Sequence, residues 1–141
     1  MATTVAQTAQ AKRIAARLRG HRGAAYERWL DDLERRGCVA LDYRLAGPTP
    51  LSYFCVRHLR GADRALVLFE SPVLAVVAVV GRHTGDPATD VYEELYETVG
   101  VRPPPEDLRD KPPCCEPDGA APVAGAAVID ALVREARRLA R

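Results

Sequence analysis

Apolar residues recur at helical intervals in the first part of the chain. The pattern predicts one helix over residues 5–20 and a second over residues 24–36. The apolar stripe of the second helix consists of Tyr26, Trp29, Leu30 and Leu33. Gly20 and Gly37 follow the two stripes and suit the ends of helices. A short strand over residues 3–7 is an alternative for the start of the first segment.

The spacing then changes to the two-residue period of β-strands. Four such runs span residues 38–45, 52–59, 64–70 and 73–80. In the second run Tyr53, Cys55, Arg57 and Leu59 share one face, and Phe54, Val56 and His58 share the other. The last run has no polar residue, which is typical of a strand covered on both faces. It is therefore expected at the centre of an antiparallel sheet of about four strands.

The last third of the chain begins with one more amphipathic helix. Asp90 suits its N-cap, residues 91–99 its body and Gly100 its end. Prolines are frequent in the segment that follows, which indicates a linker or an extended strap. The prediction is an α/β (α+β) protein with a domain over residues 1–100, a Pro-rich linker or strap over 101–122 and a C-terminal helix over 123–141.

The composition fits one globular domain. The chain has 141 residues, of which 48% are hydrophobic, so it is long enough for one core and too short for two. The formal net charge of +1 excludes binding of nucleic acid through an overall basic field, so any such contact must come from a local cluster of arginines. The longest apolar run is too short to span a membrane, and no secretory signal is visible. We therefore expect a cytoplasmic protein without membrane contact.

The four cysteines, Cys38, Cys55, Cys114 and Cys115, form no CxxC motif. In a cytoplasmic chain the expectation is free thiols, with Cys55 buried in its strand. The two adjacent thiolates in the Pro-rich segment do not complete a tetrahedral zinc site by themselves. We therefore expect neither a metal ion nor another cofactor.

Three short motifs in the middle of the chain resemble those of a known family. They are YRLAG at residues 43–47, YFCVRHLRGADR at residues 53–64, and VVGRH at residues 79–83 followed by DVY at residues 90–92. In this order they are similar to motifs of the RelE/ParE-like toxins of bacterial type II toxin–antitoxin systems. The resemblance implies a compact fold with a curved antiparallel sheet. It also implies ribosome-dependent cleavage of mRNA, as in RelE, or inhibition of gyrase, as in ParE, and an antitoxin protein as partner.

In the ribonucleases of that family, basic residues of the central strands and a Tyr or His near the C-terminus carry the reaction. The matching positions are Arg57 or Arg60, then Arg64, Arg82 and Tyr92. Arg64, Arg82, His83 and Tyr92 are therefore candidate catalytic residues, and Arg57, His58 and Arg60 are candidate substrate-binding residues. The general base would be Tyr92, His83 or His58. Cleavage through the 2′-hydroxyl needs a base, a cation beside the phosphorane and a proton donor to the 5′-oxygen. Arginine binds phosphate and stays charged, and histidine is the base that titrates nearest neutrality. This route requires no metal.

The chain departs from the family pattern in three places. Strand alternation puts Arg57 and Arg60 on opposite faces unless a bulge intervenes. A loop over residues 84–89 is inserted between Arg82 and Tyr92. The segment after residue 100 has no counterpart in the family. The fold is therefore compatible with an activity that is lost or redirected.

Three hypotheses follow from these residues. The first is a RelE-like, metal-independent endoribonuclease that acts on mRNA at the ribosome. The second is a non-catalytic protein of RelE/ParE-like fold that inhibits gyrase or binds a partner helix. The third is a structural domain whose arginines only form ion pairs. Convergence of Arg64, Arg82 and Tyr92 (or His83) in one concave site would support the first hypothesis, whereas side chains that point to different faces would exclude it. The C-terminal helix is a candidate cover for such a site.

Overall fold

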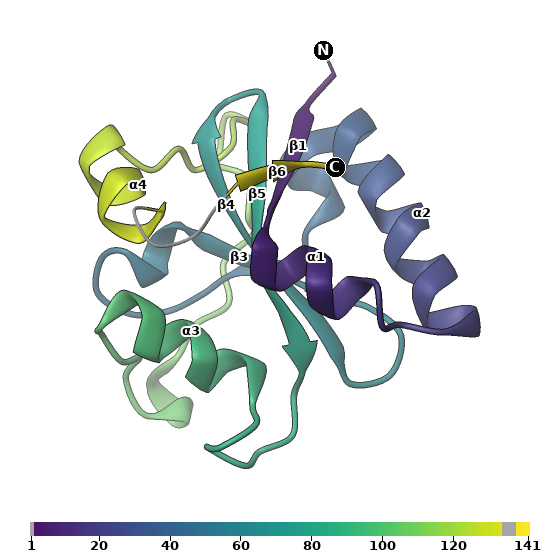
Figure 1. Ribbon diagram of the computed structural model, residues 1–141. Helices are drawn as coiled ribbons and strands as arrows, with labels where there is room; N and C mark the ends of the chain where they lie inside the picture. Colours follow the sequence, from purple (N-terminus) through teal and green to yellow (C-terminus); the bar gives the residue numbers. More distant parts are fainter. Residues whose placement is uncertain (1, 134–137) are drawn as a thin grey trace.

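The computed structural model describes residues 2–133 and 138–141 and has an α+β fold (Figure 1). A mixed sheet of six strands has the order β2-β3-β4-β5-β1-β6. The strands are β1 Thr4–Thr8, β2 Tyr43–Arg44, β3 Phe54–His58, β4 Asp63–Ser71, β5 Leu74–Arg82 and β6 Arg138–Ala140. The helices are α1 Ala9–Ala15, α2 Gly20–Arg36, α3 Val91–Val99 and α4 Ala126–Val133, with 3₁₀-helices η1 Gly37–Ala40, η2 Leu51–Tyr53 and η3 Glu106–Leu108. The α+β class is confirmed, whereas the prediction of an entirely antiparallel sheet of about four strands is wrong.

The chain begins with strand β1, so the helix predicted over residues 5–20 starts late, at α1. β1 pairs in parallel with β5, which makes the sheet mixed. Val5 and Gln7 are buried, and pairing with an interior strand outweighs the weak helical preference of so short a segment. The Thr8 hydroxyl accepts a hydrogen bond from the Ala11 amide and caps α1. The alternative of an N-terminal strand is the one observed.

Strands β3, β4 and β5 form an antiparallel meander whose register determines which side chains share a face. His58 lies opposite Arg64, and Arg64 lies opposite Gly81. In the next row Asp63 lies opposite Arg82. Adjacent rows point to opposite faces of the sheet. Arg64 and Arg82 therefore leave the sheet on different sides.

Each face of the sheet packs against its own helices (Figure 1). On the face covered by α1 and α2, the core includes Trp29, Leu33 and Cys55. On the face covered by α3 and α4, the core includes Phe54 and Leu95. β5 lies between β4 and β1 and is mostly buried, as its unbroken apolar run predicts.

The segment after α2 differs from the strand predicted over residues 38–45. It forms η1 and then only the two-residue strand β2. The 3₁₀ turn buries Ala40 and leaves Val39 57% exposed, so the residues do not alternate between two faces. The Trp29 indole donates a hydrogen bond of 3.0 Å to the Ala40 carbonyl and holds this turn against α2. Trp29 is thus a core anchor.

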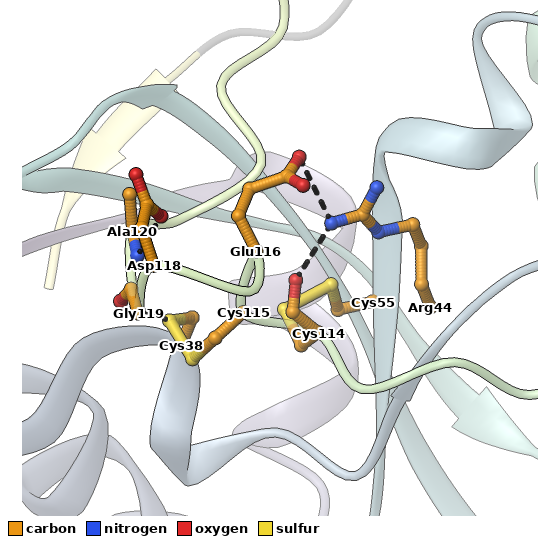
Figure 2. Close-up of a disulfide and its surroundings, with 9 residues drawn as sticks. All are labelled: Cys38, Arg44, Cys55, Cys114, Cys115, Glu116, Asp118, Gly119 and Ala120. Atoms are coloured by element: carbon orange, nitrogen blue, oxygen red, sulfur yellow. Dashed lines mark hydrogen bonds and ion pairs between the residues drawn. A yellow bond between two sulfur atoms is a disulfide. The ribbon is translucent and has the colours of Figure 1, made fainter.

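Residues 101–122, which we call the strap, are fastened to the core by two disulfides (Figure 2). The disulfides join Cys38 to Cys115 and Cys55 to Cys114. The joined residues are 77 and 59 positions apart in sequence, and such crosslinks stabilise a protein mainly by restricting its unfolded chain. The prediction of free thiols is wrong, because two adjacent cysteines of the strap reach two different cysteines of the core.

The disulfides also bear on location. Disulfides persist in oxidising compartments and are rare in the cytoplasm. The two disulfides therefore favour an oxidising compartment, and the prediction of a cytoplasmic protein is corrected accordingly. Within the described residues, no helix has the length and apolar character needed to cross a membrane.

The strap lies along β2 at the edge of the sheet. The Arg44 amide donates a hydrogen bond of 2.8 Å to the Pro112 carbonyl. The Arg44 guanidinium donates to the Cys114 carbonyl at 3.0 Å and pairs with Glu116 at 3.1 Å (Figure 2). These contacts make the segment an ordered wall of the molecule rather than a free linker.

The C-terminal helix predicted over residues 123–141 is shorter in the structure. It is observed as α4, residues 134–137 lie outside the described part of the chain, and β6 pairs with β1 instead of continuing a helix. Arg141 lies 2.7 Å from Glu34 and 2.8 Å from Asp31, both on α2. The end of the chain is therefore held at the far edge of the sheet, against α2.

Candidate functional site

A cleft of about 620 Å³ opens on the α3 face, where strands β3 and β4 meet the start of α3. His58 and Arg64, neighbours in the strand register, form its floor. His83 and Tyr92 also line the cleft, together with strap residues between 103 and 111. Residues 43–46 line it as well, so the cleft combines side chains from four separate parts of the chain.

Gly81 allows α3 to approach the sheet at this point. It lies opposite Arg64 and therefore faces the cleft side of the sheet. A Cβ atom at Gly81 would lie 3.1 Å from the Cβ and Cγ2 atoms of Val91, the first residue of α3. The missing side chain lets the start of α3 rest on the strand ends, which brings Tyr92 close to Arg64.

His83 and Asp90 form a hydrogen-bonded pair at the start of α3. The Nδ1 atom of His83 lies 2.7 Å from a carboxylate oxygen of Asp90. The amides of Thr84, Gly85 and Tyr92 donate to the same carboxylate. Burial works to raise the pKa of Asp90, but the hydrogen bonds from His83 and these amides outweigh it and lower that pKa. The carboxylate therefore stays ionised at neutral pH and orients the imidazole, which leaves Nε2 for proton exchange.

His58, at the end of β3, has a different environment. Its Nε2 atom lies 3.1 Å from the Tyr43 hydroxyl, and the two rings meet edge to face with centroids 5.6 Å apart. Desolvation lowers the pKa of His58, and the charges of Arg64 and Lys111 lower it further, while Asp42 opposes them. The imidazole is therefore neutral at pH 7, which is the form that accepts a proton.

Arg64 is a cation of the cleft floor without a carboxylate partner. Its Nη1 atom donates to the carbonyls of Gly61 and Asp63, each at 3.0 Å. Its buried Nε atom has no hydrogen-bond partner, and among the described residues no carboxylate lies within 4.0 Å of the guanidinium. A positive charge without a counter-ion in a concave site favours an anionic ligand.

Tyr92 lies between His83 and Arg64. Its ring meets the His83 ring edge to face, with centroids 5.1 Å apart. Burial raises the pKa of the Tyr92 hydroxyl and Tyr43 raises it further, whereas Arg64 lowers it, and the net shift is upward. The phenol therefore stays protonated near neutral pH, so it serves as a hydrogen-bond donor and not as a base.

The strap contributes charged groups of both signs to the cleft. The Lys111 ammonium lies 5.1 Å from the centroid of the Tyr43 ring, and the Arg109 Nε atom donates to the Pro104 carbonyl at 2.7 Å. Over the whole cleft the cationic residues are Arg44, Arg64, Arg109 and Lys111, and the carboxylates are Asp90, Glu93, Glu106 and Asp110. The formal charges of the cleft walls therefore balance.

The structure brings together the predicted residues His58, Arg64, His83 and Tyr92. It places Arg82 elsewhere, opposite Asp63 in the neighbouring register row. The Asp63 carboxylate points to α2, where it binds Arg22 at 2.6 Å. Arg64, Tyr92 and His83 thus share the cleft, but Arg82 leaves the sheet on the other face, so the predicted convergence of Arg64 and Arg82 with Tyr92 or His83 is not observed. The catalytic roles of these residues stay predictions.

Arg57 and Arg60 lie outside the cleft, in a second depression on the α2 face. Arg57 is 3.4 Å from Asp42. The prediction that alternation separates Arg57 from Arg60 is wrong, because β3 ends at His58 and the chain turns before Arg60. No described residue of α4 lines the cleft, so the described part of that helix does not cover it.

Tyr43, Arg109 and Lys111 line the cleft but were not predicted from the sequence. A Pro-rich composition indicates an extended segment but not the surface against which it packs. The cysteine pair that follows Lys111 is the sequence feature that could have indicated attachment of this segment to the core, since four cysteines can close two disulfides. Asp90 was predicted as an N-cap, and its contact with His83 has no signature in the sequence.

Among the described residues, no group of three or more His, Cys, Asp or Glu side chains is arranged to hold a metal ion. Comparison with protein-family models, with curated proteins and with solved structures finds no match to this chain. The resemblance to RelE/ParE-like toxins therefore rests on the three short motifs alone.

Proposed function

We propose that the chain is a metal-independent endoribonuclease that cleaves single-stranded RNA through its 2′-hydroxyl group. The observation that carries the proposal is Arg64, a cation without a carboxylate partner, in one cleft with two histidines. One histidine is held neutral, and the other is hydrogen-bonded to a buried carboxylate. These groups are a phosphate ligand, a base and a proton donor, which are the three parts that this reaction needs.

His58 is assigned as the base. Because its pKa is lowered, it is neutral at pH 7 and takes the proton of the 2′-hydroxyl as the 2′-oxygen attacks the adjacent phosphorus. The Tyr43 hydroxyl at Nε2 holds the ring in place, which leaves Nδ1 to accept the proton. The raised pKa of Tyr92 makes that residue unsuitable as the base.

His83 is assigned as the acid, and Arg64 as the phosphate ligand. As the bond from phosphorus to the 5′-oxygen breaks, that oxygen takes a proton from Nε2 of the His83 imidazolium, whose ring Asp90 holds. Arg64 binds the non-bridging oxygens, where negative charge grows in the phosphorane. The products are a 2′,3′-cyclic phosphate and a 5′-hydroxyl. One proton is taken up by His58 and one is released by His83, so the protons balance.

The resemblance to RelE supports mRNA as the substrate and an antitoxin as a partner. The two disulfides favour an oxidising compartment, whereas ribosomes are cytoplasmic. We therefore place free single-stranded RNA ahead of ribosome-bound mRNA as the substrate.

The test uses the oxidised full-length chain, an end-labelled single-stranded RNA and excess EDTA. We expect cleavage with 2′,3′-cyclic phosphate ends and none of the same RNA carrying 2′-O-methyl groups. His58→Ala is expected to slow single-turnover cleavage by about 10²–10⁴-fold, the usual contribution of a general base. His21→Ala is the matched control, because His21 lies on α2 outside the cleft.

Cleavage of the 2′-O-methyl RNA would exclude the 2′-hydroxyl route. Loss of cleavage in EDTA would exclude the metal-independent mechanism. No cleavage of any RNA by the wild-type chain would favour the alternative, a non-catalytic protein that uses this cleft to bind a partner.

A further inference from the structure

A second depression, of about 440 Å³, lies on the α2 face of the sheet. Its charged rim, which we call the arginine patch, consists of Arg28 and Arg35 of α2, Arg57 of β3 and Arg60 of the turn after β3. Among the described residues Asp32 is the one carboxylate that lines it, and it pairs with Arg36 from outside the patch at 2.6 Å and with Arg35 of the patch at 3.6 Å. The patch therefore carries a surplus of positive charge in a chain whose net charge is only +1.

The arginines of the patch are free to bind a ligand to different degrees. Arg57 is 3.4 Å from Asp42, and its buried Nε atom has no hydrogen-bond partner. Arg28 and Arg60 are exposed, and among the described residues neither has a carboxylate within 4.0 Å. Guanidinium groups without such partners bind phosphate oxygens in a bidentate manner.

The patch continues into the cleft through His58. This histidine lines both depressions, because it ends β3 at the sheet margin while its neighbour Arg57 points to the α2 face. His58 is therefore the point at which the two depressions meet.

The two depressions differ in charge. The formal charges that line the cleft balance, so the cleft by itself offers a polyanion little attraction beyond Arg64. The arginine patch offers that attraction but no proton-exchanging group except the shared His58. Its one aromatic residue, Trp29, is 3% exposed and donates its indole N–H to the Ala40 carbonyl, so it does not stack on a base. The patch therefore contacts the phosphate groups of a ligand and does not distinguish its bases.

We propose that the arginine patch binds the phosphate backbone of a single-stranded RNA whose scissile nucleotide lies in the cleft. The choice of RNA rests on the proposed function. The strand runs from Arg28 and Arg60 past His58 to Arg64. The substrate is consequently an oligonucleotide that extends beyond the two nucleotides at the scissile bond, and its affinity depends on salt and little on sequence.

The test compares Arg28→Gln/Arg60→Gln with Arg13→Gln/Arg17→Gln in the full-length oxidised chain. The second pair removes the same charge from exposed residues on and just after α1 that line neither depression. Binding of a fluorescein-labelled, 12-nucleotide 2′-O-methyl RNA is measured by anisotropy over a range of salt concentrations. Cleavage of a dinucleotide and of a 12-nucleotide RNA is measured alongside.

For the patch variant we expect a shallower salt dependence, with the slope of log K against log salt reduced by about 1.4, which corresponds to two lost phosphate contacts on a single strand. We expect slower cleavage of the 12-nucleotide RNA at subsaturating protein and a smaller loss for the dinucleotide. Equal affinities and slopes in the two variants would overturn the inference while leaving the proposed function intact. A wild type that cleaves neither RNA, but whose binding still depends on the patch, would refute the proposed function and keep the binding surface.

Discussion

The cleft and the arginine patch share His58 but differ in their charge and in the side chains that line them. The cleft holds two histidines, buried hydrogen bonds and balanced charges. The patch holds four arginines and one carboxylate, Asp32, which pairs with Arg36 from outside the patch and with Arg35 within it. The end of β3 thus separates the proton-exchanging groups of the cleft from the arginines of the patch. Arg57 and His58 are consecutive residues that leave β3 on opposite faces.

Two arginines near the cleft differ in whether they pair with a carboxylate. Arg22 binds Asp63 at 2.6 Å, and the Asp63 side chain is only 3% exposed. Arg64 is the next residue along the chain from Asp63, yet among the described residues it has no carboxylate partner. The hypothesis that the arginines only form ion pairs therefore fits Arg22 well and fits Arg64 poorly.

The largest difference between the loss of RNA cleavage and the loss of RNA binding is expected for His83→Ala. If His83 is the acid, its loss slows single-turnover cleavage by about 10²–10⁴-fold, while binding of uncleavable RNA is unchanged because the arginine patch is intact. Asp90→Asn is the companion variant. The amide oxygen of asparagine still caps α3, but the charge that holds His83 is gone, so we expect a smaller loss of cleavage.

An equal loss of RNA binding and of cleavage in His83→Ala would show that the two depressions are not separate in function. Circular dichroism of each variant checks that α3 still forms. An Asp90→Asn variant as slow as His83→Ala would indicate that Asp90 does more than orient the ring.

A smaller loss of cleavage, together with a loss of stability, is expected for Cys55→Ala/Cys114→Ala. Removing this disulfide costs about 3 kcal/mol of the free energy of unfolding, measured by denaturant titration of the oxidised protein. Lys111 and Arg109 of the cleft wall lie just before Cys114, so cleavage decreases. The patch contains no strap residue, so RNA binding is unchanged.

Removal of the other disulfide by Cys38→Ala/Cys115→Ala is the matched comparison, since it leaves Cys114 attached to β3. We expect a similar loss of stability and a weaker effect on cleavage. If both double variants, and the chemically reduced wild type, unfold at the same denaturant concentration as the oxidised wild type, the strap is not held by these bonds.

The parts of the fold that the sequence predicts well are those with a long, regular pattern. The apolar stripe with Tyr26 and Leu33 is the buried face of α2, and residues 74–80 of the apolar run lie in the interior strand β5. The predictions fail where a distant partner decides the structure. β1 forms because β5 offers a pairing edge, and η1 replaces a strand where Trp29 binds the Ala40 carbonyl.

The dependence on distant partners also explains which residues of the candidate site could be predicted. Arg64, His83 and Tyr92 were predicted from motifs in one segment, and the meander and α3 bring them together. Lys111 reaches the cleft through the disulfides of a segment with no regular pattern, and Arg82 is excluded by its register with Asp63. Pairing register and disulfide connectivity are properties of the folded chain that residue spacing does not specify.

The most direct test of the claim that His58 and His83 serve one phosphate site is NMR of the imidazole side chains. The chain has three histidines, and His21 lies on α2 outside the cleft, so it is an internal control. On addition of 3′-cytidine monophosphate we predict shifts of the His58 and His83 resonances and none for His21. The free protein should show a pKa of His58 below the usual 6.5, because desolvation and Arg64 disfavour its charged form. Equal movement of all three histidines, or movement of neither His58 nor His83, would contradict the account.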